Sequence, residues 1–163
     1  MKQLILVRHA KSSWDAPLRD FDRPLTGKGI QDAHLVSSNI ASQIPKAFVV
    51  WSSAATRAKE TAMIFAQNIS FPIESIEFKE ELYTFDERKL EQVIKSCPDH
   101  YEHLIVFGHN EAITNFVNKF GNTFIDNVST SGFVNIIFDQ NSWENIENGV
   151  TKKVVFPRDL KLV

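Results

Sequence analysis

The chain has 163 residues, of which 43% are hydrophobic and 23% are charged. These values are ordinary for a globular protein and exclude a disordered or low-complexity chain, and the length predicts one domain spanning residues 1–163. The formal net charge of −2 gives no broad basic field for nucleic acid or an anionic membrane. The single cysteine excludes an internal disulfide framework and a multi-cysteine metal site.

The first apolar run is too short for secretion or membrane insertion. It covers Leu4–Val7 and ends at Arg8, whereas a secretory core needs about 7–15 apolar residues and a membrane span about 20. We therefore expect a cytoplasmic protein without a membrane partner.

Three short apolar runs predict the central strands. None of them alternates with polar residues, and each is too short for a helix. Continuous apolar runs of this length are typical of strands covered on both faces, as in parallel sheets. They span residues 4–7, 47–51 and 104–107.

Amphipathic stretches lie between and after these runs. Apolar residues at helical spacing predict four helices, within residues 30–44, 58–69, 90–97 and 113–120. A short strand is predicted near residues 75–78, and two strands at 132–139 and 150–156 are predicted to form an antiparallel pair. This order predicts an α/β fold, a three-layer sandwich with a mostly parallel central sheet flanked by helices and ending in an antiparallel strand pair.

Cationic side chains follow all three apolar strands. Arg8 and His9 come directly after the first strand, Arg57 follows the second, and His109 follows the third. In open α/β sheets, ligands bind beyond the carboxyl ends of the strands. We therefore expect these four side chains to meet at one site.

Two helix N-termini are expected to add positive character to this site. Ser53 is the predicted cap of the helix that carries Arg57, and Asn110 is the predicted cap of the helix after His109. Two arginines and two histidines near these termini form a repulsive cluster without a counter-ion. Such a cluster suits a ligand with about two negative charges and several acceptor oxygens, as in a phosphoryl group.

Histidine can also react with such a group. The flanking positive charge is expected to lower the pKa of His9 and keep its imidazole neutral near pH 7. A hydrogen bond between one ring nitrogen and the backbone would leave the other nitrogen free to attack phosphorus. His9 is therefore the predicted nucleophile, and His109 is the predicted partner, charged or neutral, that steadies the equatorial oxygens.

Motifs for other chemistries are incomplete. The segment Gly27-Lys28-Gly29 lacks a third glycine and does not follow a strand, so it is not a dinucleotide-binding loop. His100 and His103 have no further ligands near them in the sequence. No metal or other cofactor is predicted.

Four segments together resemble a known family. They read LVRHAKSSW at residues 6–14, RPLTGKG at 23–29, SSAATRA at 52–58 and GHN at 108–110. In this order and after strands, they resemble the histidine phosphatase (phosphoglycerate mutase-like) superfamily, and most of all the SixA-type phosphohistidine phosphatases. The resemblance implies that His9 becomes phosphorylated, that Arg8, Arg57 and His109 form the phosphate pocket, and that no metal is used.

The chain departs from the family pattern at three positions. Ala10 follows the nucleophile where the family often has glycine, and Asp15 matches a phosphate-contacting asparagine whose role we do not transfer to it. Larger members use a carboxylate after the second helix as the general acid, and Thr84 follows Leu-Tyr here in place of a family glutamate. The candidates for this acid in the segment are Glu81 first, then Asp86 and Glu87. The alternative is that these acids form a solvated face and none of them is the general acid.

The spacing after the second helix bears on the substrate. About 35 residues separate Ile69 from Leu104, which is too few for the helical cap of larger relatives and predicts a shallow, open pocket. Such a pocket suits a phosphate presented on a protein, and imidazole leaves phosphorus more readily than an alkoxide does. We expect a metal-independent phosphatase acting on protein phosphohistidine. The alternatives are a phosphatase of the same mechanism for a small phosphorylated metabolite, and a non-catalytic phosphate-binding module.

Overall fold

A computed structural model describes residues 1–161 and forms one six-stranded sheet between two helical layers. The strand order is β3-β2-β4-β1-β5-β6. The first four strands in this order pair in parallel, and β5 is antiparallel to both of its neighbours. The strands are β1 (Lys2–Arg8), β2 (Val49–Ser53), β3 (Glu77–Lys79), β4 (His103–Gly108), β5 (Phe133–Phe138) and β6 (Val150–Val155).

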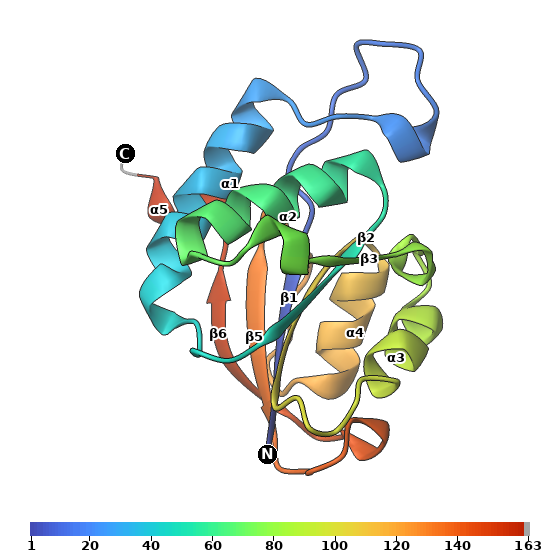
Figure 1. Cartoon of the computed structure of the whole chain (residues 1–163), viewed down its shortest axis with the longest axis vertical. Helices are drawn as coiled ribbons and strands as arrows, with labels where there is room; N and C mark the ends of the chain where they lie inside the picture. Colours follow the sequence, from blue (N-terminus) through green and yellow to red (C-terminus); the bar gives the residue numbers. More distant parts are fainter. Residues whose placement is uncertain (162–163) are drawn as a thin grey trace.

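The helices cover both faces of this sheet. Figure 1 shows α1 and α2 on one side of the strands and α3 and α4 on the other. The α-helices are α1 (Gly27–Ile40), α2 (Thr56–Ile69), α3 (Glu87–Lys95), α4 (Ala112–Phe120) and α5 (Pro157–Leu160). Short 3₁₀ helices are η1 (Asp20–Asp22), η2 (Ala41–Gln43), η3 (Ile73–Ser75), η4 (Glu80–Leu82) and η5 (Trp143–Asn145). The predicted fold class is confirmed.

The core explains why the central strands are continuously apolar. Leu4 and Leu6 pack into a cluster with α3 and α4, whereas Ile5 and Val7 of the same strand pack into a second cluster with α1 and α2. Successive side chains of a strand point to opposite faces. Because both faces of β1 are covered by helices, the four successive residues from Leu4 to Val7 are all buried.

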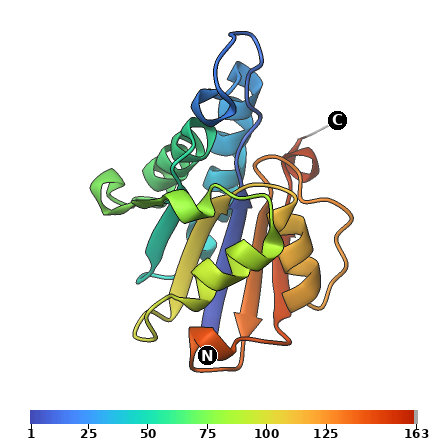
Figure 2. The same ribbon diagram turned by 90° about the vertical axis from the view of Figure 1, so that its right-hand side faces the viewer.

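The carboxyl ends of the parallel strands lie together at one end of the sheet, and the site residues lie there. In Figure 2 the chain leaves β1 and continues into a loop at the top of the molecule before it enters α1. The two ends of this loop are joined by an isolated bridge between Ser12 and Leu25. The loop also carries η1, which the apolar periodicity did not predict.

The first helix begins earlier than its apolar periodicity predicts. Thr26 caps α1 by accepting a hydrogen bond from the backbone N–H of Gly29 at 2.9 Å, so the helix starts at Gly27. Its last predicted turn is the 3₁₀ helix η2. The helical start therefore lies at the base of the loop that follows β1.

A glycine in this first turn fixes how closely the loop approaches the helix. A Cβ atom at Gly29 would lie 2.3 Å from the carbonyl oxygen of Lys11, whereas a Cβ at Gly27 would meet nothing within 4 Å. We expect Gly29→Ala to lower the free energy of unfolding by about 1–3 kcal/mol, measured by urea denaturation. Gly27→Ala is the matched control and should leave stability unchanged or raise it. Equal stability of the two variants would contradict this account.

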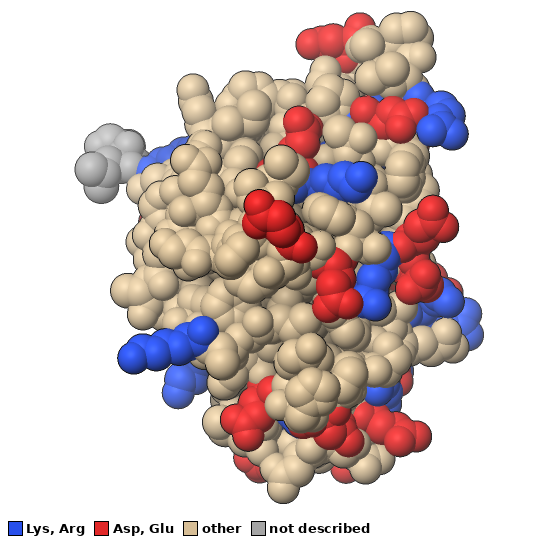
Figure 3. All heavy atoms as spheres, viewed as in Figure 1, with Lys and Arg blue, Asp and Glu red and all other residues tan. Residues whose placement is uncertain are grey.

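The surface carries charges of both signs. Figure 3 shows acidic and basic side chains interspersed over one face of the molecule. None of the helices formed by residues 1–161 is long and apolar enough to cross a membrane.

Candidate active site

His9 lies directly after β1 with its two ring nitrogens in different environments. The carbonyl oxygen of Ala10 lies 2.7 Å from Nδ1, and the Nε–H of Arg57 donates to Nε2 at 3.3 Å. Both contacts are satisfied when Nδ1 carries the proton and Nε2 carries the lone pair. The nitrogen with the lone pair therefore adjoins a guanidinium group.

Burial is the main reason that this imidazole is neutral. His9 is 8% exposed, and burial lowers its pKa to about 4, with the charges of Arg57 and Arg8 adding to the effect. The flanking charges, from which a lowered pKa of His9 was expected, contribute less than burial does. The ring is consequently uncharged near pH 7, as a nitrogen nucleophile must be.

His109 packs against His9 with its orientation set by a hydroxyl group. The two ring centroids are 5.1 Å apart, and Nε2 of His109 lies 2.8 Å from the hydroxyl oxygen of Ser53. The backbone N–H of Ala55 donates to this same oxygen. We assign the ring proton of His109 to Nδ1, because the Ser53 hydroxyl can then donate to Nε2 while it accepts from Ala55. Burial, followed by the charges of His9 and Arg57, lowers the pKa of His109 to about 2. His109 is therefore neutral.

Aromatic side chains cover His109. The rings of Tyr83 and Phe85 stand edge-on to its imidazole, at centroid distances of 5.4 and 5.6 Å. His109 is 1% exposed and does not line the open cavity that His9 lines. It therefore lies beside His9 beneath this aromatic cover.

Two buried N–H groups beside His9 lack an acceptor among residues 1–161. They are Nε of Arg8 and Nδ1 of His109. The Arg8 side chain is anchored through Nη1, which donates to the carbonyl oxygen of Val128 at 2.9 Å. A buried donor without an acceptor costs about 1–3 kcal/mol. Both groups thus favour a ligand that brings acceptor oxygens.

Arg57 has a counter-ion, Asp20, that was not expected from the sequence. The arginine lies in the first turn of α2 and is 2% exposed. Its Nη2 donates to Oδ2 of Asp20 at 2.9 Å, and its Nη1 donates to the backbone oxygen of the same residue at 2.6 Å. The interpretation of a cationic cluster without a counter-ion is therefore wrong. The carboxylate belongs to η1, in a loop without apolar periodicity.

Asp20 is held by three groups from separate parts of the chain. Its carboxylate accepts hydrogen bonds from Arg57, from Arg23 at 3.2 Å and from the hydroxyl group of Tyr83 at 2.5 Å. Partial burial acts to raise the pKa of Asp20, but the bonds from Tyr83, Arg57 and Arg23 outweigh it and lower the pKa to about 2. Asp20 is therefore an anion at neutral pH.

An open cavity of about 370 Å³ joins these groups to the surface. Trp14 lies at its mouth, 76% exposed, with its ring 3.4 Å from the guanidinium carbon of Arg23. Phe85, 53% exposed, also lines the cavity. The cavity is lined by Arg8, His9, Lys11, Ser12, Trp14, Asp20, Arg23, Arg57, Phe85, Asn110 and Thr130.

The carboxylates singled out from the sequence lie elsewhere. Glu81 is exposed on η4 and does not line the cavity. Asp86 accepts a hydrogen bond from the backbone N–H of Arg88 and caps α3. Glu87 and Asp15 also lie outside the cavity lining, and Asp15 is exposed.

Neither predicted cap residue occupies the N-cap position of its helix, which is Ala55 in α2 and Glu111 in α4. Helix α2 has no side-chain cap, because the hydroxyl of Ser53 is engaged with His109 and with the N–H of Ala55. Asn110 lies one residue before Glu111, the N-cap of α4, and its side-chain oxygen accepts from the backbone N–H of Thr114 in the first turn at 3.1 Å. Ser53 therefore orients an imidazole instead of beginning a helix.

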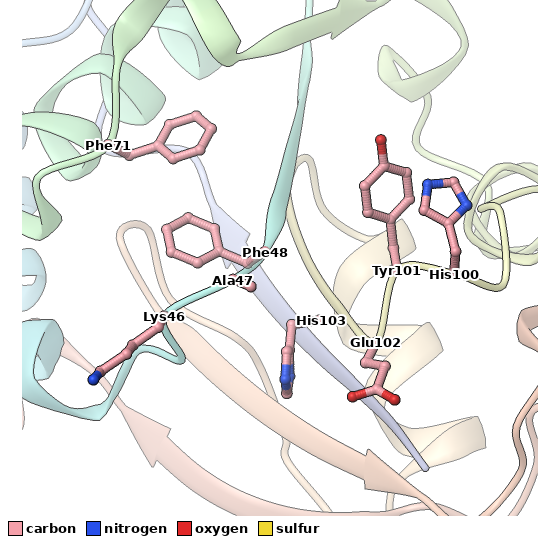
Figure 4. Close-up of a pocket in the computed structure, with 8 residues that line it drawn as sticks. All are labelled: Lys46, Ala47, Phe48, Phe71, His100, Tyr101, Glu102 and His103. Carbon is pink, nitrogen blue, oxygen red and sulfur yellow. The ribbon is translucent and has the colours of Figure 1, made fainter.

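A second cavity, of about 410 Å³, lies at the amino ends of β2 and β4, at the end of the sheet opposite the site. In Figure 4 the rings of Phe48 and Phe71 lie on one side and Tyr101 lies on the other, while the charged ends of Lys46 and Glu102 point away from each other. Its polar groups do not converge on a common point. Within residues 1–161, no three His, Cys, Asp or Glu side chains are grouped so as to hold a metal ion.

The buried histidines make stability depend on pH. Between pH 6.5 and about 4, the unfolded chain protonates His9 while the folded protein does not. The free energy of unfolding should therefore fall as the pH falls through this window, by up to about 3 kcal/mol from His9 alone. Urea denaturation at pH 7 and pH 4.5 measures the change, which should shrink in His9→Gln and persist in His100→Ala, an exposed histidine. The same pH dependence in His9→Gln as in the wild type would contradict the assignment.

Curated relatives match part of the chain. An uncharacterised protein of Mycobacterium tuberculosis is 32% identical over 103 residues, which cover 63% of this chain and 62% of that protein. An uncharacterised chloroplastic protein of Arabidopsis thaliana is 48% identical over 61 residues, 37% of this chain and 28% of its own length. The matched region thus spans less than two thirds of each relative.

Solved structures share the fold over nearly the whole chain. The protein histidine phosphatase SixA complexed with tungstate superposes with a TM-score of 0.82 at 22% identity, covering 98% of this chain and 99% of that one. A mycobacterial glucosyl-3-phosphoglycerate phosphatase complexed with VO3 gives 0.68 at 10% identity, covering 94% and 98%. Residues 4–124 match the profile of the histidine phosphatase superfamily, branch 1. The resemblance seen in the four sequence segments is confirmed, and the chain belongs to this superfamily.

Proposed function

We propose that this protein is a phosphatase that takes a phosphoryl group onto Nε2 of His9 and then passes it to water. The observation that carries the proposal is a pair of buried N–H groups, on Arg8 and His109, that find no acceptor among residues 1–161 and lie beside a neutral imidazole with its lone pair at Nε2. Phosphoryl oxygens supply the acceptors that these groups lack.

The chemistry follows from the placement of these donors. In the first step, the bond between Nε2 of His9 and phosphorus forms as the bond to the leaving group breaks. In the second step, water attacks phosphorus and the nitrogen is released. Charge on the three equatorial oxygens is stabilised by Arg57, Arg8 and Nδ1–H of His109. For His109 to take part, the covering ring of Phe85 has to shift from the position that it occupies here.

The mouth of the cavity supports a protein phosphohistidine as substrate. Trp14 and Phe85 give it an apolar, aromatic rim, against which a planar imidazole leaving group can stack. Residues 70–102 form η3, β3, η4 and α3, and we propose that the domain lacks a cap that would enclose a small molecule. A large phosphorylated partner would then have access to His9.

A small phosphorylated metabolite is the second candidate substrate. The cavity volume of about 370 Å³ is within the range of small-molecule sites, roughly 300–1,000 Å³. A glucosyl-3-phosphoglycerate phosphatase shares this fold. A phosphorylated protein would also contact the surface around the cavity, whereas a small metabolite would bind within the cavity alone.

Parallel assays of both substrate classes test the proposal. The protein is incubated with a phosphohistidine-carrying protein domain, with free phosphohistidine and with a panel of sugar and glycerate phosphates, and phosphate release is measured. We expect the highest kcat/KM on the protein donor, at least about tenfold above the small molecules. Preference for a sugar phosphate by orders of magnitude would assign the metabolite instead. Saturable phosphate binding without hydrolysis of an activated aryl phosphate would leave only a binding module.

A further inference from the structure

Asp20 is the one carboxylate among the described residues that lines the cavity. Its side chain, 41% exposed, extends from η1 at the rim, whereas His9 lies on the floor. Its backbone oxygen is bound to Nη1 of Arg57, and its carboxylate is bound by Arg23 and Tyr83. Hydrogen bonds from Arg57, Arg23 and Tyr83 therefore fix the position of Asp20.

The carboxylate occupies a place that a phosphoryl oxygen would need. Nε and Nη2 of Arg57 lie on the same edge of the guanidinium group. Nε donates to Nε2 of His9 at 3.3 Å, and Nη2 donates to Oδ2 of Asp20 at 2.9 Å. A phosphorus atom bound to Nε2 brings its oxygens to this edge, because guanidinium groups bind phosphate through two parallel N–H donors. Oδ2 and a phosphoryl oxygen consequently compete for Nη2.

Resting on the proposed function, we propose that Asp20 yields this place to the phosphoryl group and then acts as general acid for the leaving group and as general base for water. In-line attack by His9 from the floor directs the leaving group toward the rim. Asp20 lies at this rim and remains tethered there through its backbone oxygen and through Tyr83. Displacement from Arg57 therefore leaves the carboxyl group beside the leaving atom.

The two steps balance in protons and electron pairs. As the bond between His9 Nε2 and phosphorus forms, the bond from phosphorus to the leaving oxygen or nitrogen breaks, and that atom takes the electron pair and a proton from Asp20. In hydrolysis, the water oxygen bonds to phosphorus and one water proton passes to the Asp20 carboxylate. The electron pair of the nitrogen–phosphorus bond returns to His9. Asp20 is protonated after the phosphoryl group has displaced it from Arg57, is protonated again at the end of the second step, and releases this proton when phosphate leaves.

The same displacement allows Asp20, which is an anion in the resting site, to take up a proton from solvent before the first step. In the resting site the pKa of Asp20 is about 2, lowered by hydrogen bonds from Tyr83, Arg57 and Arg23 against the opposite effect of partial burial. A bound phosphoryl dianion removes the bond from Arg57 and places negative charge beside the carboxylate. Both changes raise the pKa of Asp20. Phosphate binding is thus coupled to proton uptake at the position where the proton is used.

The test compares Asp20→Asn with the wild type on phosphate esters whose leaving groups span a wide range of pKa. We expect kcat/KM to fall about 10²-fold or more on alkyl phosphates, and only a few-fold on 4-nitrophenyl phosphate and on phosphohistidine. Inorganic phosphate should inhibit Asp20→Asn at several-fold lower concentration, because its competitor for Arg57 is weakened. Asp22→Asn is the matched control, since Asp22 belongs to the same 3₁₀ helix and binds Arg19 outside the cavity lining. It should match the wild type in both measurements.

Each other outcome contradicts a defined part of the account. An equal loss on every ester, or no loss on any, would overturn the acid role of Asp20 while leaving the phosphatase intact. Unchanged inhibition by phosphate would overturn the competition for Arg57. Wild-type protein that hydrolyses none of these compounds would overturn the proposed function, and this inference with it.

Discussion

Replacing His9 with alanine is expected to abolish turnover, lowering kcat/KM at least about 10⁴-fold on every phosphorylated substrate. The reason is that Nε2 of His9 carries the lone pair that faces Arg57, and no other described residue places a neutral nitrogen nucleophile in the open cavity. Steady-state release of phosphate from 4-nitrophenyl phosphate and from a phosphohistidine donor measures the loss.

The effect has to be separated from damage to the fold. His9→Gln retains a polar side chain of similar size, and it should be as inactive as His9→Ala while its unfolding remains cooperative. His100→Ala removes an exposed histidine and should retain wild-type kinetics. Residual activity within tenfold of the wild type in both His9 variants would show that another group accepts the phosphoryl group.

The second large effect is expected at Arg57. Arg57→Ala should lower kcat/KM by about 10²–10³-fold, which corresponds to roughly 3–4 kcal/mol of transition-state stabilisation. The substitution removes two donors from the phosphoryl oxygens, and it also leaves the Asp20 carboxylate without its buried partner. That carboxylate then repels the phosphate that the site has to bind.

Kinetics of two further variants isolate this role. Arg57→Lys restores the positive charge but lacks the two parallel N–H donors of the guanidinium group, so it should recover only part of the activity. Arg88→Ala removes an exposed arginine of α3 and serves as the control. In the double variant Arg57→Ala, Asp20→Asn, aryl phosphate turnover should exceed that of Arg57→Ala alone, because the unpaired carboxylate is gone. Wild-type kinetics of Arg57→Ala would remove this residue from the site.

The arrangement of the strands could be predicted because burial has a simple signature in the sequence. The runs that became β1, β2 and β4 are apolar at every position, since helices cover both faces of these strands. The first residues of the helices could not be predicted as well, because they depend on side-chain contacts. Thr26 extends α1 to Gly27, and Ser53 turns away from α2 to bind His109.

The site was predictable only where it follows strands. Arg8, His9 and His109 stand directly after apolar runs, and the topology then brings them together. Asp20 and Tyr83 lie in irregular segments and meet across 63 positions in the sequence. No periodicity marks such a contact, so the counter-ion of Arg57 became visible only in the folded chain.

The Asp20 carboxylate changes the charge balance of the cationic cluster. A cluster of arginines and histidines is tolerated without phosphate because Asp20 partly neutralises it and because burial keeps both imidazoles uncharged. In the proposed mechanism, substrate binding is an exchange of one anion for another at Arg57. This exchange favours a dianionic phosphoryl group over a singly charged competitor.

Trapping of the phosphorylated protein tests the central claim most directly. The wild type is mixed briefly with a ³²P-labelled phosphohistidine donor, quenched in alkali, separated from the donor and divided between acid and alkali. The account predicts a label on the protein that is lost in acid, survives alkali, maps to the peptide containing His9 and is absent from His9→Ala. An acid-stable label, or a label that persists in His9→Ala, would contradict it.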